Sequence, residues 1–136
     1  MSLGMVAVLC YISHVIIGGL LWPGYSHMHQ PISDLTAANT PSRDIALPFS
    51  VAYGVLAFIF AWAFWFYERA RHVKAVFWGG LCFVALHFVS LLYGFFPEDL
   101  PGSPASFPGT MHIIITALIV PFTILTPLLI GIGFLK

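Results

Sequence analysis

Long runs of apolar residues alternate with short polar segments along this chain. Four such runs occur, and they cover about residues 3–22, 48–67, 75–96 and 110–135. A helix needs about 20 mostly apolar residues to cross the ~30 Å hydrocarbon core of a bilayer. Because each run has that length and little else remains, the pattern predicts a single all-α domain, residues 1–136, with four transmembrane helices in a bundle.

The composition agrees with a membrane protein and excludes other classes. Hydrophobic residues make up 60% of the chain and charged residues only 7%, whereas soluble domains have roughly 25% charged residues. The net charge is zero, with five basic residues, so there is no basic surface of the kind that binds nucleic acid. The partner that this composition implies is membrane lipid.

The distribution of positive charge sets the expected orientation. Arg69, Arg71 and Lys74 are concentrated in the short segment between the second and third runs. Short loops rich in Lys and Arg stay on the cytoplasmic side, so we expect this loop and both termini to be cytoplasmic in a cell membrane. The two longer loops, residues 23–47 and 97–109, then lie outside.

The two outer loops hold four of the five acidic residues, and the last run opens with a histidine, His112. The first loop carries the dense polar stretch Tyr-Ser-His-Met-His-Gln-Pro-Ile-Ser-Asp-Leu at residues 25–35. Both loops end a hairpin on the same side of the membrane, so we expect them to meet at the outer mouth of the bundle. The predicted polar site there consists of His27, His29, Ser33, Asp34, Glu98, Asp99 and His112.

Imidazole and carboxylate groups of this kind are ligands in zinc and copper sites. The candidate metal ligands are His27, His29, His87 and His112. The His-x-His spacing is not diagnostic, because neither a Cys-x-x-Cys nor a His-Glu-x-x-His motif accompanies it. We therefore expect no cofactor, and a zinc ion is the alternative.

Ser33, Asp34 and Asp99 are the candidate catalytic residues, and the first two have a structural alternative. A serine hydroxyl or a bound water could act as the nucleophile beside a His base. The Ser or the Asp could instead cap a short interfacial helix over residues 35–39 by accepting backbone N–H groups. No Gly-x-Ser-x-Gly elbow is present, which argues against an ordinary serine hydrolase.

The candidate functional residues inside the predicted spans are His14, His87 and Thr116. Ionisable groups in hydrocarbon are costly unless they are paired, so they are functional candidates by default. His14 and His87 lie at equal depth on the first and third helices and could face each other. The alternative is a neutral imidazole that bonds a hydroxyl such as Ser13, Ser90 or Thr116 and only packs helices together.

The second helix carries a strip of small residues on one face. Such strips let helices approach each other closely. This strip favours internal packing, with a homo-oligomer interface as the alternative. Its members are Ser50, Gly54, Ala57 and Ala61.

The polar stretch after the first span, Phe-Pro-Glu-Asp after the third and a His that opens the fourth together resemble one family. It is the bacterial membrane family catalogued as a domain of unknown function, number 998. The Ile-Ser-Asp element is also faintly similar to the Frag1, DRAM and Sfk1 type of membrane proteins. The matching positions are Ser33, Asp34, Pro97, Asp99 and His112.

The resemblance implies a polytopic membrane protein and assigns no activity. Members of that family resemble six-helix proteins, whereas this chain has four spans before Lys136. The resemblance therefore implies either a shortened member of the family or a protein with two further helices. If the two helices are missing, self-association would most easily take their place.

We favour a noncatalytic membrane module whose outer polar site binds a small ligand, a lipid headgroup or a partner. The alternative is a metal-dependent membrane hydrolase of a lipid-like substrate, in which metal-bound water attacks and Asp34 or Asp99 is the base. A third interpretation is a proton-coupled carrier that works as an oligomer, with His14 and His87 as the relay.

Overall fold

The computed structural model describes residues 2–135, and these residues form helices and no strand. Each of four helical segments is long and apolar enough to cross a membrane, so the predicted fold class, an all-α membrane protein with four transmembrane helices, is confirmed. The long helices are α1 (Ser2–Leu21), α2 (Arg43–Glu68), α3 (Lys74–Ser90) and α4 (Phe107–Phe134). Three short 3-10 segments are η1 (Ile32–Thr36), η2 (Arg69–Arg71) and η3 (Leu91–Gly94).

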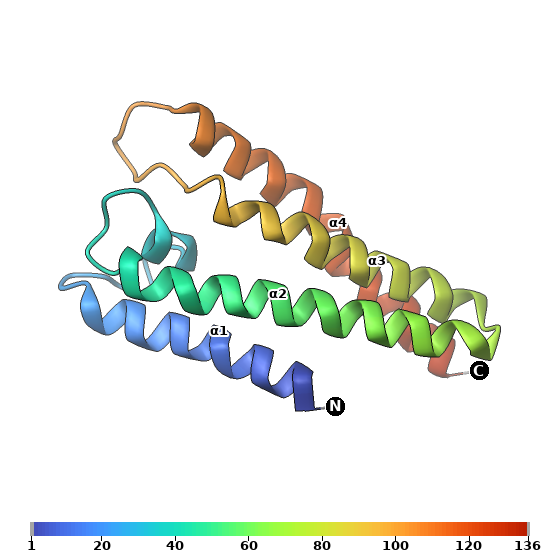
Figure 1. Cartoon of the computed structure of the whole chain (residues 1–136). Coiled ribbons are helices and arrows are strands. Elements are labelled where there is room, and N and C mark those ends of the chain that lie inside the picture. The colour runs from blue at the N-terminus through green and yellow to red at the C-terminus, as the bar shows by residue number, and fades with distance from the viewer. Residues whose placement is uncertain (1, 136) are drawn as a thin grey trace.

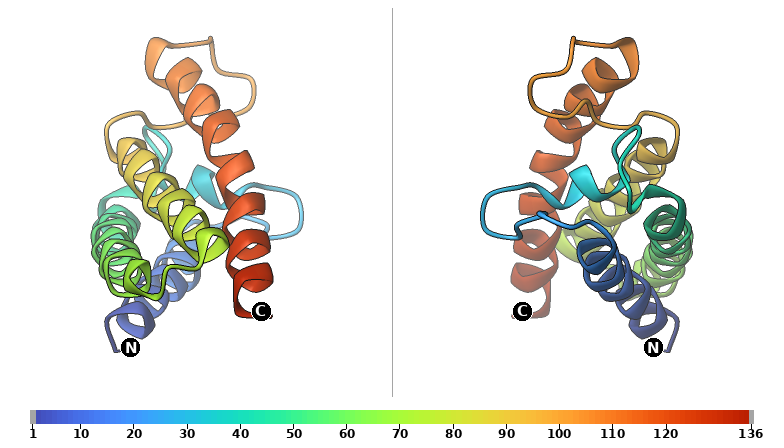
Figure 2. Two further views of the ribbon diagram at one scale, coloured as in Figure 1. Left: turned by 90° about the vertical axis from the view of Figure 1, so that its right-hand side faces the viewer. Right: turned by 90° about the vertical axis from the view of Figure 1, so that its left-hand side faces the viewer.

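The long helices pack in chain order, α1 on α2, α2 on α3 and α3 on α4. Within residues 2–135, α4 does not return to pack extensively on α1. The four helices therefore form an open arc rather than a closed ring, and the short segment η1 contacts α1 and α2 on the side that faces α4 (Figure 2).

The two ends of the bundle differ in kind. Both long loops lie at one end, which we call the loop end, and the α2–α3 connection lies at the other, beside the end of α4 (Figure 1). α1 begins short of that connection, with Gly4 against Phe60 of α2. The positive charges of Arg69, Arg71 and Lys74 belong to this second end. That it is cytoplasmic stays a prediction from the charge, and Lys136 lies outside the described residues.

The observed helix boundaries differ from the expected ones at the loop end. α2 begins at Arg43, so Pro48 lies inside the helix and not in its first turn. α3 ends at Ser90 and continues as the 3-10 segment η3. α4 begins at Phe107, because the Ser106 side chain accepts a hydrogen bond from the Gly109 N–H at 3.1 Å and caps the helix.

Small residues of α2 and α3 are buried where helices of this chain pack against each other. Gly54, Ala57 and Ala61 of the strip on α2 are all buried, and Gly79 of α3 is also buried, against the α4 backbone. Close approach of this kind is how membrane helices gain packing energy. The strip therefore serves internal packing, and a homo-oligomer through it stays an untested prediction.

Candidate functional site

Residues 31–42, which we call the plug, fold back onto the ends of α1 and α2. Leu35 is fully buried, and a Cβ added to Gly18 of α1 would lie only 3.1 Å from it. The carbonyls at the end of η1 are bonded by side chains that follow in sequence. Ser42 Oγ donates to the Leu35 carbonyl at 2.8 Å, and the Arg43 guanidinium donates to the Thr36 carbonyl. The plug is thus fixed both by burial and by hydrogen bonds to its own backbone.

Asp34 is fully buried inside the plug. Its Oδ2 accepts a hydrogen bond from Gln30 Nε2 at 3.3 Å, whereas its Oδ1 has no partner among residues 2–135. Burial raises the pKa of the Asp34 carboxyl, the bond from Gln30 opposes this rise, and the nearby Glu98 carboxylate adds to it. Asp34 therefore lies close enough to the second loop for the Glu98 carboxylate to act on its pKa.

The capping role expected for Ser33 or Asp34 is wrong. The helical segment is η1, which begins at Ile32, and its N-cap is Pro31 with no side-chain hydrogen bond. Pro31 is extended, with φ −68° and ψ 153°, so the turn starts two residues earlier than a cap at Ser33 would require. Asp34 consequently lies within the turn, and its carboxylate points to Gln30 rather than to the backbone of residues 35–39.

Asp99 fixes the second loop to the start of α4. Its two oxygens accept hydrogen bonds of 2.7 Å from the Ser106 N–H and from Ser106 Oγ. These bonds lower the pKa of the Asp99 carboxyl. A Cβ at Gly109 would overlap this carboxylate, so only glycine permits the close approach. Asp99 is thus occupied by a structural contact.

His112 and Glu98 meet at the loop end of α4. His112 Nδ1 bonds the Phe96 carbonyl at 3.0 Å, and its Nε2 lies 3.8 Å from a Glu98 oxygen. The His112 ring packs on Tyr93 with 4.5 Å between centroids, and the Tyr93 hydroxyl bonds Thr116 Oγ1 at 2.8 Å. The second loop, η3 and the start of α4 therefore form one polar region, and the first loop approaches it through Asp34, on which the Glu98 charge acts.

His27 and His29 do not join this region. Both are exposed; the His27 ring packs edge-on against Tyr25 at 4.8 Å and lies beside Gly19. Residues 2–135 contain no group of three or more His, Cys, Asp or Glu side chains arranged to hold a metal ion. The candidate ligands are therefore not brought together as a metal site among residues 2–135, and a bound zinc ion stays an untested alternative.

A cavity of about 490 Å³ lies between the helices and runs from the plug into the membrane region. All four long helices, η1 and η3 contribute to its wall. The lining residues with polar side chains are Tyr11, His14, Ser33, Thr36, Ser50, Tyr53, His87, Ser90, Tyr93, His112, Thr116 and Thr123. The cavity thus gathers the intramembrane residues His14, His87 and Thr116 together with His112 and Ser33.

His14 and His87 are connected through two tyrosines rather than to each other. The Tyr11 ring lies 6.1 Å from His14 and 5.0 Å from Tyr53, and Tyr53 lies 6.1 Å from His87. These aromatic rings form a continuous wall from α1 across α2 to α3. Sequence reasoning missed the tyrosines, although Tyr11 and His14 share a helix face by their spacing.

Two of the three hydroxyl partners expected for the imidazoles, Ser90 and Thr116, are engaged elsewhere. Ser90 Oγ donates to the Leu86 carbonyl at 2.7 Å, and Thr116 Oγ1 donates to the His112 carbonyl at 2.9 Å. Both His14 nitrogens and His87 Nδ1 are buried without a hydrogen-bond partner in residues 2–135. These two imidazoles, whose residues line the cavity, therefore have unused hydrogen-bonding capacity at nitrogens that lie behind its surface.

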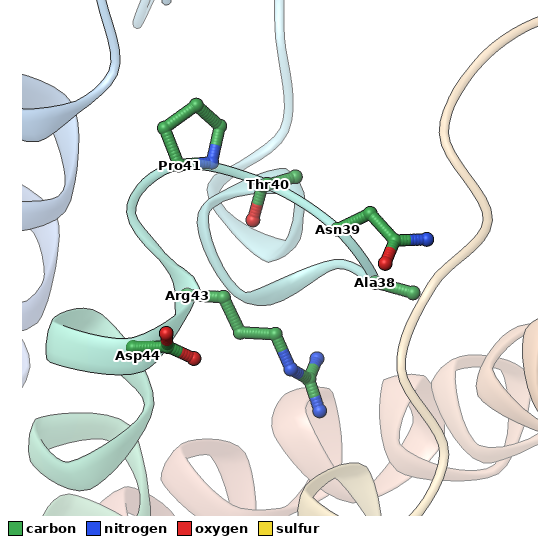
Figure 3. A pocket seen from close by; sticks show the side chains of 6 residues that line it. All are labelled: Ala38, Asn39, Thr40, Pro41, Arg43 and Asp44. Carbon is green, nitrogen blue, oxygen red and sulfur yellow. The ribbon is translucent and has the colours of Figure 1, made fainter.

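A second hollow, of about 590 Å³, lies at the surface where α2 begins (Figure 3). It is lined by Ala38, Asn39, Thr40, Pro41, Arg43 and Asp44. Its single cation, Arg43, already bonds the Thr36 carbonyl, and Asp44 supplies the opposite charge. This hollow is part of the outer surface of the plug, and its one cation is already used in a structural hydrogen bond. The cavity between the helices is therefore the stronger candidate site.

The fold and the cavity together define the class: a multi-pass helical membrane protein with a cavity between its spans whose mainly apolar wall includes hydroxyl and imidazole groups. Residues 5–135 match the model of a family described as a protein of unknown function, DUF998. The chain belongs to this family, as its motifs predicted. Comparisons with curated proteins and with solved structures returned no match. The fainter likeness to the Frag1, DRAM and Sfk1 type stays a prediction.

Proposed function

We propose that this protein is a noncatalytic membrane module that binds the polar end of a lipid-like molecule in the cavity between its helices. The observation that carries the proposal is the cavity itself, about 490 Å³ in volume and lined by twelve hydroxyl- or imidazole-bearing side chains. That volume falls within the range of small-molecule sites, about 300–1,000 Å³. The bound molecule is a membrane component, because the cavity lies among membrane-spanning helices.

The energetics of polar groups in a membrane support a bound partner. A polar group buried in an apolar medium without a hydrogen bond costs several kcal/mol, roughly 2–7, and intramembrane ionisable residues are functional candidates for this reason. Here both His14 nitrogens and His87 Nδ1 are buried without a partner in residues 2–135. A ligand that hydrogen-bonds them removes this cost.

The arc of helices supports access from the bilayer. α1 and α4 flank the cavity with Tyr11 and Thr123 among its lining, yet they do not pack extensively on each other within residues 2–135. A lipid can slide its polar end between these two helices and leave its chains in the hydrocarbon. The plug covers the loop end, which we assign to the outer side of a cell membrane because Arg69, Arg71 and Lys74 lie at the opposite end.

The two alternatives have less support. For the hydrolase, no hydrogen bond within residues 2–135 joins Ser33 Oγ to an imidazole, and Asp99 is bound to Ser106. For the carrier, the cavity lining reaches only from the loop end to Tyr11 on α1 and Thr123 on α4. A noncatalytic binding role requires neither a nucleophile nor a polar path across the whole membrane.

A cavity-filling substitution tests the proposal. Ser50 lines the cavity and makes no side-chain hydrogen bond in residues 2–135, so Ser50→Phe fills the space without removing a bond. Val55→Phe is the matched control, because Val55 lies on the same helix and is exposed to lipid. Lipids retained by each protein are measured by native mass spectrometry after purification in mild detergent.

We expect the wild type and Val55→Phe to retain a lipid at defined stoichiometry and Ser50→Phe to lose it. Helix content is checked by circular dichroism for all three proteins. Equal retention by folded Ser50→Phe, or no retention by the wild type, contradicts the proposal.

A further inference from the structure

We infer that the cavity selects a lipid with an uncharged, hydroxyl-bearing polar end, the chemistry of a diacylglycerol or a long-chain alcohol, over phospholipids. This inference rests on the proposed function and names the ligand class for the same site. The observation behind the inference is the composition of the cavity wall, which has twelve side chains with a hydroxyl or an imidazole and none with a formal charge.

The wall contains no Lys, Arg, Asp or Glu among its described lining residues. A charged headgroup would leave water without meeting a counter-charge, and an unpaired buried charge is strongly destabilising. A neutral headgroup loses only its hydrogen bonds to water, which the wall can replace. The absence of charge therefore favours neutral over ionic ligands.

The nearest charges work against a phosphate group in particular. Glu98 lies 3.8 Å from His112 Nε2, and His112 lines the cavity. Asp34 lies close by in the plug, where the Glu98 charge acts on it. The two acids at this end would repel an anionic headgroup, and no cation in the wall offsets that repulsion.

The unused hydrogen-bonding groups match a hydroxyl. A neutral imidazole presents one N–H donor and one acceptor nitrogen, and a hydroxyl likewise donates one hydrogen bond and accepts others. His14 lacks partners at both nitrogens and His87 at Nδ1 within residues 2–135. The Tyr53 ring lies between them in the wall. A hydroxyl that reaches an imidazole after a rotation of the ring can therefore both donate and accept there, whereas a phosphate oxygen only accepts.

Three lipids with the same acyl chains test the ligand class. Wild-type protein in nanodiscs is labelled with a diacylglycerol that carries a diazirine in one chain, and labelling is competed by dioctanoylglycerol, dioctanoyl phosphatidic acid or dioctanoyl phosphatidylcholine. We expect dioctanoylglycerol to compete at concentrations on the order of tenfold lower than the two phospholipids, the discrimination expected when a single buried polar group is left unpaired. Labelled peptides should come from α1 and α4.

Substitutions locate the effect. His14→Leu should weaken competition by dioctanoylglycerol on the order of tenfold, because one buried donor and acceptor pair is lost. His14→Gln retains a donor and an acceptor and should recover part of the affinity. His29→Leu is the control, because His29 is exposed outside the cavity. The wild-type competition series tests the inference even if a variant fails to fold.

Each outcome decides one of the two proposals. Stronger competition by phosphatidic acid or by phosphatidylcholine overturns the ligand class and leaves lipid binding in the cavity intact. Equal competition by all three lipids also overturns the class. Absence of saturable labelling, together with unchanged lipid retention in Ser50→Phe, overturns the proposed function as well.

Discussion

The two loops at the same end of this protein hold their carboxylates in opposite ways. Asp34 in the plug is fully buried, with one oxygen unpartnered and its pKa raised. Asp99 in the second loop accepts two hydrogen bonds of 2.7 Å from Ser106, and its pKa is lowered. The first loop is thus held by burial against α1 and α2, and the second by a charge-assisted cap on α4.

The difference shows what each loop can contribute to the cavity. The plug lines the cavity with Ser33 and Thr36, so its packing determines the shape of the loop end. The second loop contributes mainly the position of α4, whose His112 and Thr116 form the opposite wall. Damage to the plug should therefore affect stability most, whereas damage to the cap should affect the start of one helix.

The largest effect is expected for Leu35→Ala in the plug. Leu35 is fully buried, and truncation of such a side chain costs about 2–5 kcal/mol of unfolding free energy through lost burial and a cavity. Leu100→Ala in the second loop is the control, because Leu100 is only half-buried. The free energy of unfolding in mixed detergent micelles measures both. Equal losses of unfolding free energy for the two variants would contradict the conclusion that burial holds the first loop but not the second.

An intermediate effect is expected for Ser106→Ala. The change removes the cap of α4 and one of the hydrogen bonds to Asp99, and loss of an N-cap costs about 0.5–2 kcal/mol. Hydrogen exchange should become faster in the first turn of α4, while the exchange of η1 stays unchanged. Ser103→Ala is the control, since Ser103 is exposed. Faster exchange in η1 would show that the two loops are held as one unit.

The smallest effect is a pair of opposite pH dependences. A raised pKa in the folded state means that Asp34 contributes stability below the unfolded Asp value, about 3.9, and loses it as pH rises through its folded pKa. A lowered pKa means that Asp99 contributes stability above that value and loses it as pH falls through its folded pKa. Stability is measured between acid and neutral pH for the wild type, Asp34→Asn and Asp99→Asn.

As pH rises, Asp34→Asn should therefore gain stability relative to the wild type, and Asp99→Asn should lose it. Asn at position 34 can still accept the Gln30 hydrogen bond, so the change isolates the charge. Slopes of the same sign for both variants would refute the contrast between the two carboxylates.

The spans could be predicted because hydrocarbon imposes a strong and local rule on composition. Every run of about 20 apolar residues became a helix, and the expectation that both loops meet at one end followed from their connection to those helices. Glu98 and His112 were correctly placed at that end, 3.8 Å apart. Hydropathy and topology therefore suffice for the architecture.

The interior of the site depends on contacts that local patterns do not encode. The end of η1 is held by Ser42 and Arg43, which lie later in sequence and bond the carbonyls of Leu35 and Thr36, whereas a capping rule considers only a few neighbouring residues. Tyr11 and Tyr53 lie within apolar runs, where aromatic residues also face lipid. Only the arrangement of α1, α2 and α3 shows that these rings line a cavity.

The most direct test of the account is an experimental structure of the wild-type protein in nanodiscs made from native membrane lipid. We predict ordered non-protein density in the cavity, within hydrogen-bond distance of His14 or His87, with acyl chains that leave between α1 and α4. A cavity that contains only water, or one closed by direct packing of α1 on α4, would contradict it.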